Sequence, residues 1–254
     1  MIDGGAHNNK FYRLGQARQR AQELPSANRK GDFLAMLSHE LRSPLASIHY
    51  GIRLLSHQTQ DTPTAQRIKE VLERQVRRMT QLIDDLLDIS LIAHGRLSLQ
   101  RERVDLRDVV SHAIETLESD IKQRDHRLTT ALPDTPVWLH ADPGRLEQVF
   151  VNLLANASRY TDTAGELAVA VDVRDDQAVV RVRDSGIGIA PESLPHLFDP
   201  FWQADKAAPR SRSGLGIGLA LVRNLVESHG GNVTAASAGL GRGSEFTVCL
   251  PKED

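Results

Sequence analysis

Residues 142–160 read DPGRLEQVFVNLLANASRY and carry the signals of one amphipathic helix. Asp142 is a typical N-cap, and Pro143 suits the first turn, where its missing N–H costs nothing. The apolar stripe consists of Leu146, Val149, Phe150, Leu153 and Ala157, and the polar stripe beside it of Gln148, Asn152, Asn156 and Arg159. Asparagine is a poor helix former, so two asparagines one turn apart favour a functional role. Their amide oxygens suit a cation such as Mg²⁺ together with phosphates.

The segments around this helix predict a mixed α and β domain. We expect strands near residues 97–99, 127–131, 137–140, 166–173, 178–183, 233–237 and 244–250, and helices near 106–122, 142–160 and 217–228. We expect Asp175 and Asp176 to form the turn of a β-hairpin. The strands cluster with antiparallel connections and do not alternate strictly with helices. The pattern therefore favours an α/β layer sandwich of the α+β class.

The preceding part of the chain predicts two long helices. Apolar residues recur at alternating steps of three and four over residues 34–55, and again from Ile68 to Ile89 with an end near Gly95. Residues 58–63 break the pattern, so the expected unit is an antiparallel helical hairpin. Each helix has a narrow row of apolar residues, here called its seam. Two such seams are best buried in a four-helix bundle made by two chains, which predicts a homodimer. A monomer whose hairpin packs on the C-terminal region is the alternative.

Composition excludes several classes of protein. The formal net charge is −2, which gives no reason to expect nucleic acid or an anionic membrane as a partner. Cys249 is the only cysteine, which excludes an internal disulfide and fits a reduced cytosolic setting. The apolar runs are short and interrupted by charges, so we expect no membrane segment and no signal peptide. Residues 1–30 are expected to be a linker or a signal-input helix continued from something upstream.

An exposed histidine in the first helix is a candidate reactive group. The helical pattern turns His39 away from the apolar stripe, and Glu40 follows it. Pro44 lies just beyond, where a proline within a helix removes one hydrogen bond and costs about 3 kcal/mol. Such a cost beside a His-Glu pair indicates a functional distortion. An ordinary surface histidine is the alternative, since the chain has 10.

Two glycine-rich segments complete the candidate site. Asp184 begins the sequence DSGIGI, and strand alternation points its carboxylate toward an apolar face, where it needs hydrogen-bond donors such as an exocyclic amino group. A simple turn is an equal alternative. The second segment, residues 214–219, opens a helix, a setting that can bind phosphate. No Gly-x-x-x-x-Gly-Lys-Ser/Thr loop occurs in the sequence.

Taken in order, these segments resemble the boxes of the sensor histidine kinases. SHELRSPL at residues 38–45 resembles the H-box, with Ser43 where Thr or Asn is usual. The N-box corresponds to residues 152–157, the G1 box to 184–188, the F-box to 198–201 and the G2 box to residues from Gly214. The resemblance implies domains at 31–95, for dimerisation and histidine phosphotransfer, and at 96–254, for ATP binding.

The resemblance also implies a role for each site residue. His39 would be the phosphoacceptor, Glu40 would orient its ring, and Ser43 would help a water attack the phosphorylated receiver. Asn156 would bind Mg²⁺ with Asn152 beside it, Arg159 would contact phosphate, Tyr160 would pack on the nucleoside, and Asp184 would read adenine. The remaining ATP-site residues would be Gly186, Gly188, Phe198, Gly214, Gly216 and Gly218, with residues 203–213 as a mobile lid.

The implied reaction is ATP-dependent phosphorylation of His39, followed by transfer to an aspartate of a response-regulator receiver domain. The expected location is the cytoplasm, with the chain standing alone or as the cytosolic part of a larger sensor. A gyrase-like or mismatch-repair-like ATPase is one alternative, with Glu147 as its near candidate base. The other is an ATP-binding pseudokinase scaffold, for which the sequence shows no lesion.

Overall fold

A computed structural model describes residues 41–42, 44–55, 63–93, 97–203 and 215–253. The chain divides into two compact units, Met1–Gln81 and Leu82–Asp254, and the division falls inside helix α2 (Pro63–Ala93). The two units are described separately. Within the described residues, no helix is long and apolar enough to cross a membrane.

The first unit contains the predicted helical hairpin. Residues 44–55 are helical, and α2 begins at Pro63, where the fixed φ of proline suits the first turn. The helices meet at Gly51, which is buried: a Cβ atom there would lie 2.7 Å from Leu72 Cδ2 and 3.4 Å from Ile68 Cγ2. Ile68 and Leu72 are half-buried, as expected for seam residues. Gly51 therefore allows the two backbones to approach closely.

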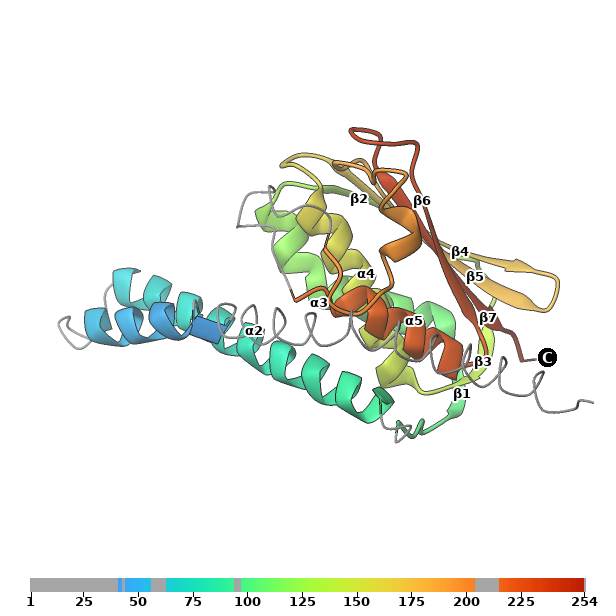
Figure 1. The fold of residues 1–254 in the computed structure, drawn as a ribbon, viewed down its shortest axis with the longest axis horizontal. Helices are drawn as coiled ribbons and strands as arrows, with labels where there is room; N and C mark the ends of the chain where they lie inside the picture. Colours follow the sequence, from blue (N-terminus) through green and yellow to red (C-terminus); the bar gives the residue numbers. More distant parts are fainter. Residues whose placement is uncertain (1–40, 43, 56–62, 94–96, 204–214, 254) are drawn as a thin grey trace, which may run out of the picture. The chain divides into compact units, whose positions relative to one another are not determined.

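The second unit contains a five-stranded sheet in the order β2-β4-β5-β7-β6 (Figure 1). Its strands are β2 (Arg127–Ala131), β4 (Glu166–Arg174), β5 (Gln177–Asp184), β6 (Asn232–Ala236) and β7 (Ser244–Pro251). β2 runs parallel to β4, and the other neighbours are antiparallel. A separate two-stranded sheet pairs β1 (Glu102–Asp105) with β3 (Trp138–Ala141). The layer sandwich is confirmed.

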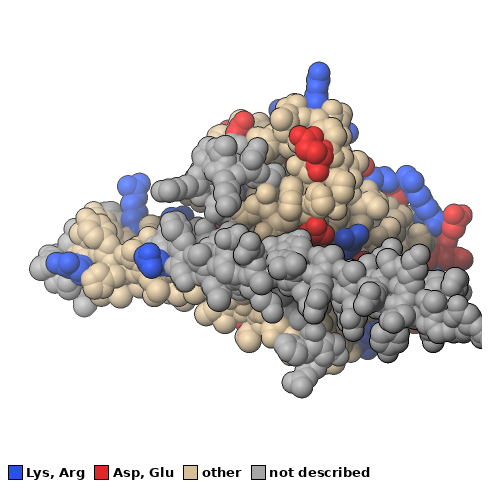
Figure 2. All heavy atoms as spheres, viewed as in Figure 1, with Lys and Arg blue, Asp and Glu red and all other residues tan. Residues whose placement is uncertain are grey.

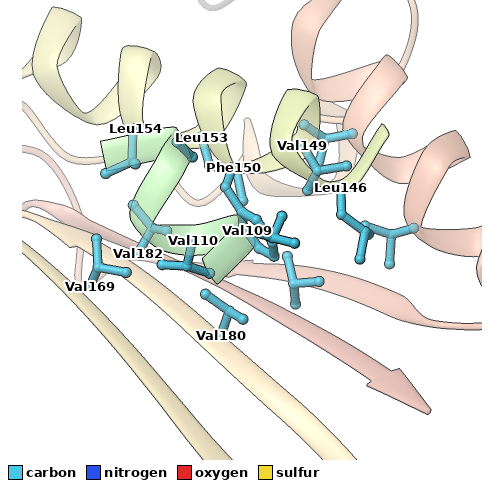
Figure 3. Packing of buried hydrophobic residues seen from close by; sticks show 14 of the residues in the cluster. Val109, Val110, Leu146, Val149, Phe150, Leu153, Leu154, Val169, Val180 and Val182 are labelled. Atoms are coloured by element: carbon cyan, nitrogen blue, oxygen red, sulfur yellow. The ribbon is translucent and has the colours of Figure 1, made fainter. Parts of the chain in front are cut away.

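Three helices cover one face of the larger sheet (Figure 1). They are α3 (Leu106–Gln123), α4 (Pro143–Tyr160) and α5 (Gly218–Ser228), and a 3₁₀ turn, η1, spans Leu194–His196. Alternate residues of the strands face these helices, and Figure 3 shows Val180 and Val182 pointing toward Val110 and Phe150. Phe150 is 1% exposed. The core therefore forms between the helices and the sheet.

Aspartate side chains cap the N-termini of α3 and α4, and the cap of α4 is the one that the sequence predicted. Asp142 caps α4 by accepting a hydrogen bond from Arg145 N–H at 3.1 Å, and Pro143 lies in the first turn, so both predictions are confirmed. Asp105 caps α3 in the same way and also accepts from Val137 N–H. Burial alone would raise the pKa of Asp105, but the hydrogen bonds from Arg107 and Val137 outweigh it and hold the pKa below its usual value.

The structure differs from the sequence prediction in three elements. Residues 97–100 are not a strand, because the pairing with β3 uses Glu102–Asp105 instead. The β2–β4 pair is parallel, which the expectation of antiparallel connections missed. The turn η1 was not predicted. The turn at Asp175 is as expected, with a φ of 52° that matches the left-handed conformation of a tight hairpin.

Candidate nucleotide-binding site

Helix α4 presents the predicted polar residues beside its buried stripe. Asn152, Asn156, Arg159 and Tyr160 are all half-buried, whereas Leu153, Leu154 and Ala157 are buried. The side chains of this group are thus partly accessible while their helix is fixed by the core. Such fixed and accessible side chains can bind a ligand without first being ordered.

Asn152 faces the beginning of α5. A Cβ atom on Gly218 would lie 3.3 Å from Asn152 Oδ1, so glycine leaves room for the amide at this point. The Nδ2 atom of Asn152 is buried and has no hydrogen-bond partner among the described residues. An unpaired buried donor is costly, so an acceptor such as a phosphate or a carbonyl oxygen would fit here.

Asp184 ends β5 with a carboxylate that is held in place by its neighbours. It is 6% exposed, and its Oδ1 accepts hydrogen bonds from Gly186 N–H at 2.8 Å and from Ser244 N–H at 3.3 Å. Its Oδ2 accepts from the Ser244 hydroxyl. These donors offset the cost of burying the Asp184 carboxylate. The sequence pattern alone had suggested that a ligand would supply the donors. A carboxylate has about four lone-pair sites, so Asp184 can still accept from an amino group.

The G1 glycines approach protein backbone closely. A Cβ atom on Gly186 would lie 2.4 Å from Tyr160 O, and one on Gly188 would lie 2.1 Å from Gly239 O. Gly188 also has a φ of +68°, which side-chain-bearing residues rarely adopt. Ile187 N–H donates to Tyr160 O at 3.1 Å. These contacts tie the G1 segment to the end of α4, so Asp184 and Tyr160 belong to one site.

Sequence reasoning missed the loop before β7. Gly243 N–H donates to Gly186 O, Gly241 N–H donates to Ile187 O, and Ser244 holds Asp184 as described. The signal was present, because Gly239, Gly241 and Gly243 alternate immediately before the strand. Alternating glycines at a strand entrance indicate close backbone approach.

The F-box and G2 segments meet at the base of the site. Phe201 N–H donates to Gly216 O at 2.9 Å, and a Cβ atom on Gly216, whose φ is +67°, would lie 2.6 Å from Trp202 O. Phe198 is 8% exposed and packs edge-on against Phe246, with ring centroids 6.4 Å apart. Its side chain is thus part of the core, and a nucleotide contact by Phe198 stays a prediction.

Several predicted residues lie outside the described part of the chain. They are His39, Glu40, Ser43, Gly214 and all of the expected lid except Gln203. Their assignments stay predictions. Pro44, the predicted source of the distortion, is buried within the helical residues 44–55.

Glu147 lies in a setting that disfavours the ATPase alternative. The Thr116 hydroxyl of α3 donates to Glu147 Oε1 at 3.3 Å. Asn156 follows nine residues later on the same helix, which at about 100° per residue places it on the opposite side. Glu147 therefore does not belong to the polar stripe. It is not placed to act as the base that activates water in the ATPase alternative.

Two family descriptions match the chain in succession. Residues 29–95 match "His Kinase A (phospho-acceptor) domain", and residues 141–254 match "Histidine kinase-, DNA gyrase B-, and HSP90-like ATPase". The second match defines the class of the domain that contains Asp184 and α4. It is a nucleotide-binding sandwich of the kinase, gyrase and chaperone type.

Individual relatives and solved structures that are similar to this chain are histidine kinases. The sensor histidine kinase TrcS of Mycobacterium tuberculosis is 37% identical over 238 residues, which cover 91% of this chain and 45% of TrcS. The solved histidine kinase AdeS of Acinetobacter baumannii is 28% identical with a TM-score of 0.62, covering 85% of this chain and 98% of that one. Full-length ShkA, solved in complex with AMPPNP, is 28% identical with a TM-score of 0.62, covering 86% and 45%.

The chain belongs to the sensor histidine kinases of two-component signalling. It combines a phosphoacceptor hairpin with an ATPase-type sandwich, as the sequence predicted. The chain spans less than half the length of TrcS.

Proposed function

We propose that this chain is an ATP-dependent histidine autokinase that phosphorylates its own His39 and passes the phosphoryl group to a response regulator. The observation that carries the proposal is the held carboxylate of Asp184 beside the asparagine face of α4. AMPPNP, the ligand of ShkA, is an ATP analogue, which supports ATP as the ligand here. The adenine amino group would donate to Asp184.

The residues present fit a magnesium ion that arrives with its nucleotide. Within the described residues, no group of three or more His, Cys, Asp or Glu side chains could hold a metal ion. The protein would therefore contribute the amide oxygen of Asn156, and phosphate oxygens would complete the shell. Mg²⁺ bound there would neutralise charge on the triphosphate. Arg159, half-buried one turn further along α4, would contact the same phosphates.

The transfer requires His39 to attack in line with the departing ADP. The lone pair of one ring nitrogen forms the N–P bond, while the bond between the γ-phosphorus and the β–γ bridging oxygen breaks and its electron pair leaves with ADP. Glu40 would take the proton from the other ring nitrogen, since an adjacent carboxylate can fix the tautomer. The described residues of the nucleotide-binding domain would hold the nucleotide for this step, and that domain would bring it to His39.

The partners follow from the same proposal. The receiving group would be an aspartate on a separate receiver domain, and Ser43 would position water for its dephosphorylation. The hairpin would pair with a second copy, because α2 exposes Val76, Ile83, Leu87 and Leu91 at 52%, 47%, 58% and 39%. An exposed apolar row of this kind is typical of an association surface.

Labelling with γ-labelled Mg-ATP tests the proposal. We expect acid-labile, base-stable phosphate on His39, because ring protonation makes imidazole a good leaving group. His39→Gln should lose the label, His49→Gln should keep it, and Asp184→Asn should lower it through weaker ATP binding. Incubation with purified receiver domains then tests the transfer. Acid-stable label, or label that persists in His39→Gln, would refute the proposal.

A further inference from the structure

A buried histidine just before β2 has no role in the site described so far. His126 is 8% exposed. Its N–H donates to Ile121 O at 3.1 Å across the turn that follows α3, and the N–H of the next residue, Arg127, donates to Gly165 O at 2.9 Å. The backbone that carries the imidazole ring is therefore held on both sides of His126.

The ring of His126 contacts the end of α4. Its Nε2 lies 3.1 Å from Ser158 O. A carbonyl oxygen can only accept a hydrogen bond, so Nε2 carries the hydrogen and donates it. The last four carbonyls of a helix have no partner within the helix, and Ser158 O is one of them in α4. His126 thus caps the C-terminus of α4 from a different element.

A second bond from outside the helix holds the same turn of α4. Tyr160 O accepts from Ile187 N–H at 3.1 Å, and a Cβ atom on Gly186 would lie 2.4 Å from the same oxygen. Two carbonyls of the last turn therefore accept from residues outside α4, one from His126 and the other from the G1 segment.

Stability alone does not explain a histidine at this position. The Nδ1 atom of His126 is buried and has no hydrogen-bond partner among the described residues. The same is true of the hydroxyls of Ser158 and Thr161, which are 4% and 2% exposed. Burying unpaired polar atoms costs free energy, and an apolar side chain at residue 126 would avoid part of that cost. Polar groups that are kept at such a cost are expected near functional sites.

We propose that His126 is a positioning residue for the nucleotide, because its bond to Ser158 O orders the last turn of α4 before ATP binds. The inference rests on the proposed kinase function, in which Arg159 contacts phosphate and Tyr160 packs on the nucleoside. Both residues directly follow Ser158, and helix ends fray. A turn that is already ordered loses less conformational entropy when the ligand binds. His126 therefore raises the affinity for the nucleotide by acting through its neighbours.

The test measures two quantities on the full chain. Calorimetry gives the dissociation constant for Mg-AMPPNP, and labelling gives the rate of His39 phosphorylation at saturating Mg-ATP. His126→Phe keeps a planar ring without the donor and should raise the dissociation constant about three- to tenfold, as expected for the loss of one hydrogen bond. His126→Gln keeps an N–H at a similar reach and should bind within about twofold of the parent. The saturated rate should stay within about twofold in both variants, because only binding is weakened.

Matched variants separate this role from loosened packing. Ser158→Ala removes the unpaired hydroxyl from the same turn and leaves the carbonyl in place, so it should bind as the parent does. His112→Phe alters an exposed histidine of α3 and should also bind normally. If His126→Phe does not fold, His126→Asn takes its place with the same expectation, because the shorter amide does not reach Ser158 O.

The outcomes distinguish this role from the kinase function. A dissociation constant for His126→Phe within about twofold of the parent would overturn the role of His126. An equal rise in Ser158→Ala, or weak binding by His126→Gln, would do the same. Fewer binding sites with an unchanged dissociation constant would show that His126 serves stability only. A parent chain that binds Mg-AMPPNP but acquires no label would refute the kinase function, and the binding comparison would still decide the role of His126. A parent chain that does not bind Mg-AMPPNP would refute both.

Discussion

Helices α2 and α4 share a sequence pattern but differ in what covers them. Both are amphipathic, with 31 and 18 residues, and both carry apolar side chains at helical spacing. On α4, Leu146 and Leu153 are 0% exposed, whereas on α2 Leu87 is 58% exposed and Val76 is 52% exposed. Periodicity thus predicts that a helix has an apolar face, but it does not say whether the same chain covers that face.

Truncating one apolar residue on each helix tests this difference most directly. Phe150→Ala removes a side chain that is 1% exposed and should lower the free energy of unfolding of the nucleotide domain by about 3–5 kcal/mol. Leu87→Ala should change the same transition by less than about 0.5 kcal/mol, since Leu87 is mostly exposed. Urea denaturation followed by circular dichroism measures both. A loss below about 1 kcal/mol for Phe150→Ala would contradict the packing of α4.

A charged substitution in the exposed apolar row of α2 tests whether a second copy of the chain covers that row. Leu87→Glu should weaken self-association about 100-fold, equivalent to about 2.7 kcal/mol, because an ionised carboxylate would enter an apolar interface. Sedimentation equilibrium over a range of concentrations gives the dissociation constant. Glu70→Gln, which alters an exposed polar residue of α2, should leave the constant unchanged. A parent chain that is monomeric at micromolar concentration would rule out the homodimer.

The fold was largely predictable where local signals agree. The N-cap at Asp142, the proline after it and the apolar stripe together identified α4 to within its observed bounds. The strand at residues 97–99 was wrong because β1 depends on pairing with β3, about 40 residues away. The parallel β2–β4 pair was missed for the same reason. Non-local pairing leaves little trace in a single segment.

The site was predictable as a set of segments but not as a set of contacts. The burial of Asp184 was anticipated from strand alternation. Its donor Ser244 was not, because that residue comes from a strand 60 positions later. Gln148 was assigned to the polar stripe from its helical position, but its side chain donates to Asp88. Periodicity predicts the direction in which a side chain points, but it does not identify the group that the side chain contacts. Phe198 carried a family motif and lies in the core.

The smallest expected effect concerns the attachment of α4 to α5. His229, at the end of α5, is 6% exposed; its Nδ1–H donates to Leu225 O at 2.7 Å, and its Nε2 accepts from Asp142 N–H at 3.1 Å. This arrangement requires a neutral ring, because protonation of Nε2 would remove the acceptor that Asp142 uses. Burial lowers the pKa of His229, and the hydrogen bond to Leu225 opposes this only partly.

A lowered folded-state pKa fixes the sign of the pH dependence. The unfolded chain binds the proton first, near pH 6.5, so the stability due to neutral His229 is complete above that pH and is lost as the pH falls toward the folded value. In His229→Gln the side-chain oxygen can still accept from Asp142, and the stability should fall less between pH 7 and pH 5. Urea midpoints across this range measure the slope, with the exposed His112→Gln as the control that should follow the parent chain. A parent and His229→Gln with equal slopes would show that the ring does not hold α4 in its neutral form.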